Sequence, residues 1–176
     1  MLFFRGAYFL LSTMVIRNVQ KQDIPGIKAV IDSTELFPSE MLDDMIKGYL
    51  ENPKDSSNIW MTEVKQDDGD KAEVPISIVY AVPEKMTAGT YNALLLAVSS
   101  DAQGQGHGSK CMQSLEKELK EKRDARILLV ETSGTDDFAR TRAFYEKIGF
   151  EKEARIRDFY EAGDDKIVYR KDLTKK

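Results

Sequence analysis

Apolar residues recur every three or four positions in two stretches of the first half of the chain. Residues 22–32 and 38–50 both show this spacing, which places their apolar side chains on one face of a helix. Asp23 can cap the first of these helices, and Pro25 suits its first turn. A short strand ending at Val19 comes before them. The pattern therefore predicts one strand followed by two helices.

Shorter apolar runs follow, and their lengths are typical of strands. Residues 59–64 and 75–82 predict two strands joined by a polar, acidic loop at residues 65–73. The run ALLLAV at residues 93–98 is too short for a typical helix and is bounded by polar residues. We therefore expect it to form a strand that is buried on both faces.

Three glycines, Gly104, Gly106 and Gly108, stand at alternate positions before a stretch that predicts a helix starting near Gly106. The apolar side of this helix consists of Cys111, Met112, Leu115 and Leu119. Glycine loses much conformational freedom on folding, so three of them suggest unusual dihedral angles or the close approach of another group. The unpaired N–H groups at a helix start attract phosphate, and the loop therefore predicts an anion site. A simple tight turn is the alternative.

The glycine spacing does not match the two common nucleotide-binding motifs. A dinucleotide fingerprint needs a further glycine three residues after Gly106, where the chain has Ser109. A P-loop needs Gly-Lys-Ser/Thr, whereas the order here is Gly108-Ser109-Lys110. What remains is the pattern Gln103-x-x-Gly106-x-Gly108 between a strand and a helix. This pattern resembles the Arg/Gln-x-x-Gly-x-Gly/Ala signature of the GNAT superfamily of acetyl-CoA-dependent N-acetyltransferases.

The resemblance extends through the second half of the chain. ILLVETSG at residues 127–134 resembles the next strand of the family, and TRAFYEKIGF at residues 141–150 resembles the helix after it. Residues 153–173 resemble the closing pair of strands. The fold class that we expect is α/β, with a mixed, mostly antiparallel central sheet flanked by helices. The resemblance also implies that the central strands, at residues 93–98 and 127–131, splay apart around the pantetheine arm of acetyl-CoA.

The resemblance assigns a cofactor site to the glycine loop. It implies that the CoA pyrophosphate lies on this loop and that pantetheine pairs with the preceding strand as an added strand would. The predicted cofactor-binding residues are Ala97, Val98, Gln103, Gly104, Gln105, Gly106, His107, Gly108, Ser109 and Arg142. Arg142 is included because Phe138 replaces an asparagine that contacts the cofactor arm in many relatives. We expect the His107 side chain to face phosphate or solvent.

Acetyl transfer to an amine needs a hydrogen-bond donor for the oxyanion, an acid for the leaving thiolate and a base for the amine. Tyr145 matches the family's tyrosine near the CoA sulfur and is the predicted acid, with a packed core tyrosine as the alternative. Glu131 is the predicted base, because Asn92 stands where many relatives have a carboxylate; Glu131 could instead satisfy backbone N–H groups. Asn92 and Tyr160 are the predicted substrate-binding residues.

Composition narrows the class of protein. A chain of 176 residues suits one domain, and we expect residues 14–176 to form it, with residues 1–13 as an extension or an upstream start. The apolar N-terminal stretch is too short to span a bilayer and lacks the features of a signal peptide. A net charge of −4 argues against a general nucleic-acid surface.

One cysteine and one histidine cannot form an intramolecular disulfide or a typical structural zinc site. We therefore expect a cytoplasmic protein without a bound metal, and with neither nucleic acid nor a membrane as a partner. The family resemblance implies that its partners are acetyl-CoA and an amine. A homodimer is compatible with these features.

Three classes of function stay open. The first is transfer of an acetyl group from acetyl-CoA to a primary amine of a small molecule or a peptide N-terminus by direct attack. The second is a CoA-binding sensor or regulatory module with little or no turnover, and the third is a structural α/β domain. Tyr145 favours catalysis, whereas Asn92 shifts some weight to the sensor.

Overall fold

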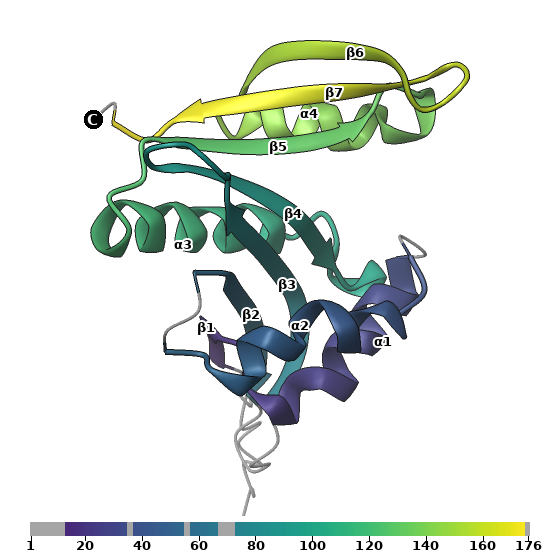
Figure 1. Ribbon diagram of the computed structural model, residues 1–176. Coiled ribbons are helices and arrows are strands. Elements are labelled where there is room, and N and C mark those ends of the chain that lie inside the picture. The colour runs from purple at the N-terminus through teal and green to yellow at the C-terminus, as the bar shows by residue number, and fades with distance from the viewer. Residues whose placement is uncertain (1–12, 35–36, 55–56, 67–72, 175–176) are drawn as a thin grey trace, which may run out of the picture.

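The computed structural model describes residues 13–34, 37–54, 57–66 and 73–174. The predicted extension, residues 1–13, lies outside the described residues apart from Thr13, and so does most of the predicted polar loop. The strands in Figure 1 are β1 (Thr13–Asn18), β2 (Ile59–Gln66), β3 (Glu73–Pro83), β4 (Thr90–Val98), β5 (Ile127–Ser133), β6 (Glu151–Glu161) and β7 (Asp164–Asp172). The α-helices are α1 (Ile24–Thr34), α2 (Met41–Glu51), α3 (His107–Lys122) and α4 (Ala139–Lys147).

The strands form one sheet in the order β1-β2-β3-β4-β5-β7-β6. The β4–β5 pair is parallel, and the other neighbouring pairs are antiparallel. Figure 1 shows α1 and α2 beside the half of the sheet that contains β1 to β4, while α4 lies beside β5 and β7. The predicted α/β class, with a mixed, mostly antiparallel sheet flanked by helices, is confirmed.

Two hydrophobic cores lie on opposite faces of the sheet. One contains the apolar side of α3, as the spacing predicted, together with residues of β5, β7 and α4. The other contains the apolar sides of α1 and α2 around Trp60 and Tyr80, whose rings stack with their centroids 3.9 Å apart. Among the described residues, none of the helices combines the length and the apolar character that crossing a bilayer requires.

β4 moves from one core to the other at a bulge. Ala93 pairs with Ala81 and Leu95 pairs with Tyr80, so Leu94 has no partner on β3. Residues two apart in a regular strand share a face, but Ala93 belongs to the core under α3 and Leu95 to the core under α1 and α2. Because of the extra residue, side chains two positions apart on either side of the bulge point to opposite faces of the sheet.

The bulge coincides with the end of the β4–β5 ladder. That ladder runs from Thr90–Ile127 to Ala93–Val130 and includes no residue beyond the bulge. The predicted splay of the central strands is confirmed. The expectation that residues 93–98 are buried on both faces is wrong, because Leu94 is 53% exposed and the end of β4 borders a cavity.

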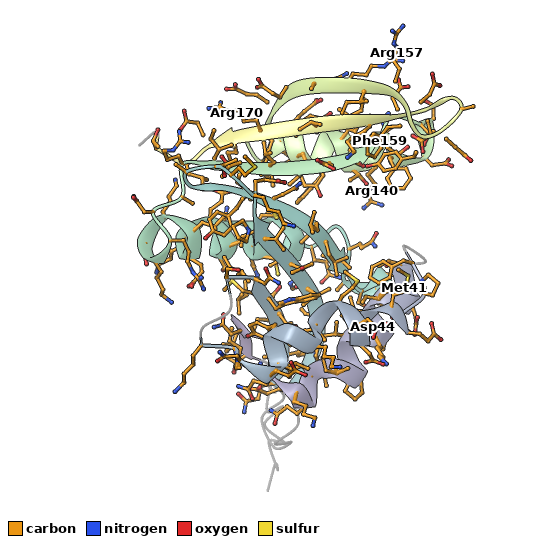
Figure 2. The ribbon with its side chains drawn as sticks, viewed as in Figure 1. Met41, Asp44, Arg140, Arg157, Phe159 and Arg170 are labelled. Atoms are coloured by element: carbon orange, nitrogen blue, oxygen red, sulfur yellow. The ribbon has the colours of Figure 1, made fainter. Side chains whose placement is uncertain are left out.

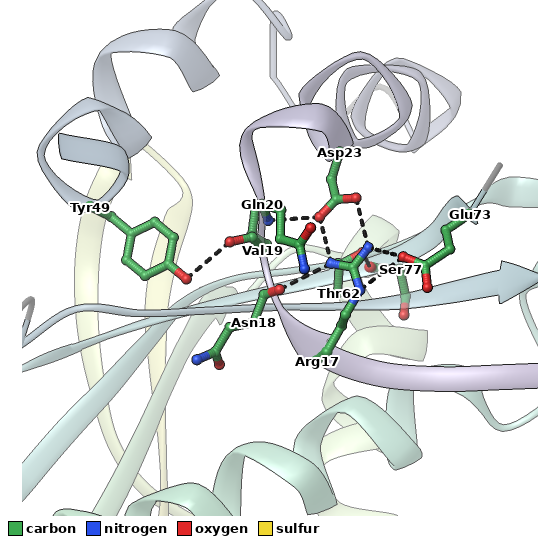
Figure 3. Close-up of polar contacts among 9 residues, drawn as sticks. All are labelled: Arg17, Asn18, Val19, Gln20, Asp23, Tyr49, Thr62, Glu73 and Ser77. Carbon is green, nitrogen blue, oxygen red and sulfur yellow. Dashed lines mark hydrogen bonds and ion pairs between the residues drawn. The ribbon is translucent and has the colours of Figure 1, made fainter. Parts of the chain in front are cut away.

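An ion-pair network fixes the chain where β1 leads into α1 (Figure 3). Arg17 donates from Nη1 to Oδ2 of Asp23 at 2.7 Å and from Nη2 to Oδ1 at 2.9 Å, and it also pairs with Glu73. Asp23 is 2% exposed, and its Oδ2 accepts the backbone N–H of Gln20 at 2.7 Å. The side chain of Asp23, the predicted cap, therefore bonds to a backbone N–H three residues before it. The hydrogen bond with Asp23 raises the pKa of Arg17, which stays charged.

Replacing Asp23 tests whether this network anchors the first helix. Asp23→Asn should lower the free energy of unfolding by about 2 kcal/mol, because it removes the buried charge that pairs with the Arg17 guanidinium. Urea denaturation measures the change. The control is Asp43→Asn, which removes an exposed ion pair with Lys28 and should cost less than about 0.5 kcal/mol. Equal losses in the two variants would contradict the anchoring role.

Candidate active site

A cavity of about 360 Å³ lies where β4 has separated from β5. Its walls come from the end of β4, the glycine loop, the first turn of α3 and one face of α4. The predicted cofactor-binding residues that line it are Ala97, Val98, Gln103, Gly104, Gly106, His107, Gly108 and Ser109. The sequence pattern therefore identified most of the cavity wall that is formed by the end of β4, the glycine loop and the first turn of α3.

Two predicted cofactor-binding residues do not line the cavity. The amide of Gln105 donates to the backbone oxygen of Asp101 at 3.0 Å and is exposed. Nη1 of Arg142 donates to the backbone oxygens of Ser133 and Thr135, both at 2.7 Å. The Arg142 guanidinium thus holds the turn between β5 and α4, because those carbonyl groups lie within its reach. Its expected contact with the cofactor has no support in this geometry.

Two cations that the sequence argument did not select line the cavity, Arg140 and Lys147 of α4. Nη2 of Arg140 lies 3.9 Å from the point where a Cβ of Gly104 would be. In Figure 2, Arg140 extends from the layer of β5 and α4 toward the other half of the molecule. Arg140, Phe144 and Lys147 all line the cavity and are spaced as residues on one helix face are. That helical phase is the signal that distinguishes Arg140 from Arg142.

Two of the three loop glycines have backbone conformations that favour glycine. Gly104 and Gly106 have φ angles of +77° and +90°, a region that L side chains rarely adopt. A Cβ on Gly106 would meet no atom within 4 Å, so its backbone conformation, rather than protein packing, calls for glycine. A Cβ on Gly108 would lie 3.4 Å from the Phe144 ring, an ordinary van der Waals contact, so neither packing nor backbone conformation requires glycine there.

Tyr145 reaches the same cavity from α4. The helix ends at Lys147, Gly149 follows with a φ of +91°, and the N–H of Phe150 bonds back to the Tyr145 carbonyl at 3.0 Å. The Tyr145 ring packs against Phe150 and Tyr169 and is 7% exposed. Burial raises the pKa of Tyr145 to about 12, so the hydroxyl keeps its proton at neutral pH and can donate a hydrogen bond.

A polar cluster lies at the first half of β4 and the end of β5. Asn92 is 3% exposed, and its Nδ2 donates to Oε1 of Glu84 at 3.0 Å and to Oε1 of Glu131 at 3.3 Å. Oε2 of Glu131 pairs with Nζ of Lys166 at 2.6 Å. Oδ1 of Asn92 is buried and has no hydrogen-bond partner in the part of the chain that the structure describes. Sequence reasoning missed Glu84, which belongs to no motif.

The hairpin of β6 and β7 brings two aromatic rings to this cluster. A register shift in β6 and the φ of +51° at Asp158 precede Phe159 and Tyr160, whose rings meet edge to face. Nζ of Lys166 lies 3.5 Å from the centre of the Phe159 ring, which Figure 2 labels beside β7. Burial, and then the charge of Glu131, raises the pKa of Tyr160. Tyr160 is thus near the predicted base, although neither residue lines the cavity.

The sequence predicted that the His107 side chain faces phosphate or solvent. Exposure to solvent is excluded, because the ring is 6% exposed and its Nδ1 lies 2.8 Å from Oε2 of Glu63 on β2, a residue that is 1% exposed. An isolated carboxylate in a protein interior is costly, and His107 supplies the partner of Glu63. His107 also lines the cavity, so a contact with phosphate stays a prediction.

Comparison with solved structures places the fold among acetyltransferases. A GNAT-family protein from Desulfovibrio desulfuricans is 28% identical, with a TM-score of 0.81 over 92% of this chain and 100% of that chain. The ribosomal-protein-S18-alanine N-acetyltransferase from Escherichia coli is 18% identical, with a TM-score of 0.69 over 93% of this chain and 96% of that chain. An aminoglycoside 6'-N-acetyltransferase complexed with coenzyme A is 15% identical, with a TM-score of 0.69 over 92% of this chain and 98% of that chain.

None of the curated proteins compared with the chain matches it. A family model described as an acetyltransferase (GNAT) domain matches residues 57–152, which are more than half of the chain. The chain therefore belongs to the GNAT acetyltransferase family.

Proposed function

We propose that the protein transfers an acetyl group from acetyl-CoA to a primary amine of a small molecule or a peptide N-terminus. The observation that carries this proposal is the cavity at the β4–β5 separation, which gathers a glycine loop, two cations and the Tyr145 side chain. The names of two structural neighbours support it: one is an N-acetyltransferase of a protein alanine, and the other is an aminoglycoside N-acetyltransferase with bound coenzyme A.

The groups around the cavity suit the phosphates and the pantetheine arm of CoA. The left-handed Gly104 and Gly106 lead into the start of α3, where unpaired N–H groups favour phosphate, and Arg140 and Lys147 add positive charge. Beyond Leu94, β4 still pairs with β3 but no longer with β5. Its backbone groups on the β5 side are therefore available to the amide groups of pantetheine, as at the edge of a sheet, except the Val98 carbonyl, which accepts from Nε2 of Gln103 at 3.2 Å.

Direct attack forms a C–N bond, breaks the C–S bond and releases a thiolate. The bulge at Leu94 takes backbone out of the ladder beside the cavity, so its N–H is a candidate donor to the developing oxyanion. The Tyr145 hydroxyl is the candidate donor to the thiolate. With a pKa of about 12, against about 8.5 for an ordinary thiol, Tyr145 stabilises the thiolate by hydrogen bonding more readily than by complete proton transfer.

The amine must also lose a proton, and Glu131 is the proposed acceptor. It follows Val130, the last β5 residue paired with β4, so it stands where the two strands begin to separate. Asn92 and Lys166 each donate to one oxygen of Glu131, so an amine shares the carboxylate with these two donors when its proton is transferred. Glu84 contacts the same Asn92 amide but lies farther back, at the β3–β4 hairpin.

The same engagement of Glu131 favours a second candidate function. If Lys166 held the carboxylate permanently, the protein could bind CoA without efficient acetyl transfer and would then be a sensor or regulatory module. Turnover distinguishes the two functions, because both require CoA binding.

A thiol-release screen with acetyl-CoA tests the proposed function. Polyamines, amino acids, aminoglycosides and short peptides serve as acceptors, and at least one class should give amine-dependent release.

The variant Tyr145→Phe tests the proposed donor to the thiolate. It should bind CoA as tightly as wild type, as measured by calorimetry, while kcat falls about 10²-fold. This loss is at the low end for acid catalysis because a thiolate leaves readily. CoA binding without release by any acceptor would support the sensor, and equal turnover would exclude Tyr145 from the mechanism.

The proton acceptor is tested by two matched variants at the Asn92 amide. Glu131→Gln should lower kcat/KM about 10²-fold, because an amide cannot accept the proton of the amine. Glu84→Gln should keep kcat/KM close to wild type. Thermal melting of both variants separates a loss of chemistry from a loss of stability. If Glu84→Gln alone lowered kcat/KM, Glu131 would not be the base.

A further inference from the structure

The buried pair of His107 and Glu63 lies beneath the glycine loop and has no part in the mechanism above. His107 is the first residue of α3, and Glu63 belongs to β2, against which α3 packs. The two residues are 44 positions apart, and Nδ1 and Oε2 meet at 2.8 Å. His107 also lines the cofactor cavity. The His107 ring therefore lies between the buried Glu63 carboxylate and the cavity in which phosphate is expected.

The groups around the pair supply no other partner for the Glu63 charge. Cys111 of α3 lies close enough for Glu63 to affect its thiol, but burial raises the pKa of Cys111 to about 11 and the thiol stays neutral. Ser77 of β3 contacts that thiol at 2.9 Å and carries no charge. Among the described residues, His107 forms the one ion pair with Glu63, and β4 brings no ionisable side chain to this part of the cavity wall.

Arg140, Tyr145 and Lys147 of α4 face the same cavity, so the cations on this helix are placed for an anionic ligand in it. They are not paired with Glu63 in the described structure.

This isolation limits where the protons of the pair can be. A buried pair is stable when its net charge is zero, because an uncompensated charge in the interior is costly. Net neutrality is reached with an imidazolium and a carboxylate, or with a neutral imidazole that accepts the carboxyl proton at Nδ1. In both arrangements the other ring nitrogen, Nε2, carries a hydrogen. Nε2 lacks a hydrogen when the pair is net negative, or when the carboxyl proton lies on Oε1 and Nδ1–H donates to Oε2.

Nε2 is the ring atom that remains for a ligand. Nδ1 is turned to Glu63, and none of the hydrogen bonds found among the described residues involves Nε2. We infer that Glu63 fixes the His107 ring so that Nε2–H donates a hydrogen bond to a phosphate oxygen of bound CoA. This inference rests on the proposed function, because it requires the cavity to bind CoA. His107 is then a cofactor-binding residue and Glu63 a positioning residue.

Two substitutions of His107 separate the two sides of the ring. The amide of asparagine reaches the position of Nδ1 and that of glutamine the position of Nε2. His107→Asn should therefore keep a hydrogen-bond donor for Glu63 and lose less melting temperature than His107→Gln, while CoA affinity falls about tenfold through loss of the cavity donor. His107→Gln should bind CoA closer to wild type but melt at a lower temperature, because Glu63 loses its partner. Calorimetry with CoA and thermal melting measure both effects.

Nitrogen NMR of the wild-type protein provides a readout that does not depend on a variant. The chain has one histidine, so its ring signals need no further assignment. We expect a proton on Nε2 in the free protein and a shift of the Nε2–H signal when CoA is added. Glu63→Gln removes the buried charge, so the ring should exchange between its two neutral tautomers and give averaged nitrogen shifts.

The outcomes separate this inference from the proposed function. CoA binding by wild type with an unchanged Nε2–H signal, or a folded His107→Asn variant with wild-type affinity, would overturn the role of His107 and leave acetyl transfer standing. No CoA binding by wild type would overturn both. Reduced affinity in His107→Asn, together with a CoA-dependent Nε2–H shift, would support the inference.

Discussion

β4 contributes to both hydrophobic cores and separates from β5 at one position, Leu94, which has no partner in the ladder with β3. Before this residue, β4 pairs on both sides and contributes to the core under α3; after it, the strand contributes to the core under α1 and α2. A continuous ladder between β4 and β5 would satisfy the backbone groups of both strands and close the space between them. The bulge keeps one side of β4 open without disrupting either core.

Opposite charges are arranged along this opening. At the C-terminal end of β4, the start of α3 and the cations of α4 favour an anion. At the beginning of the separation, Glu84 and Glu131 surround the buried Asn92, and Lys166 holds one of the two carboxylates. A ligand that is anionic at one end and receives an amine at the other would match this order. The proposed reaction has that requirement, because the phosphates and the thioester of acetyl-CoA lie at opposite ends of its pantetheine arm.

Features set by local backbone geometry were predictable from the sequence. The left-handed Gly104 and Gly106, and Gly149 at the end of α4, are signalled by residue type at fixed spacing. The bulge was not predictable, because the apolar run around Leu94 contains no interruption and the omitted residue is determined by the register with β3. Pairing of His107 with Glu63, and of Glu131 with Lys166, joins distant segments, which a single sequence does not reveal.

The central claim is that bound CoA occupies the open side of β4, and hydrogen exchange of the backbone amides tests it most directly. Saturating CoA should slow exchange at those amides of residues 95–98 that β3 leaves unpaired, and at the first turn of α3. Amides within the β2–β3 ladder should be unaffected, and Arg140→Met should raise the CoA concentration needed for protection. CoA binding that leaves residues 95–98 unprotected would contradict the account.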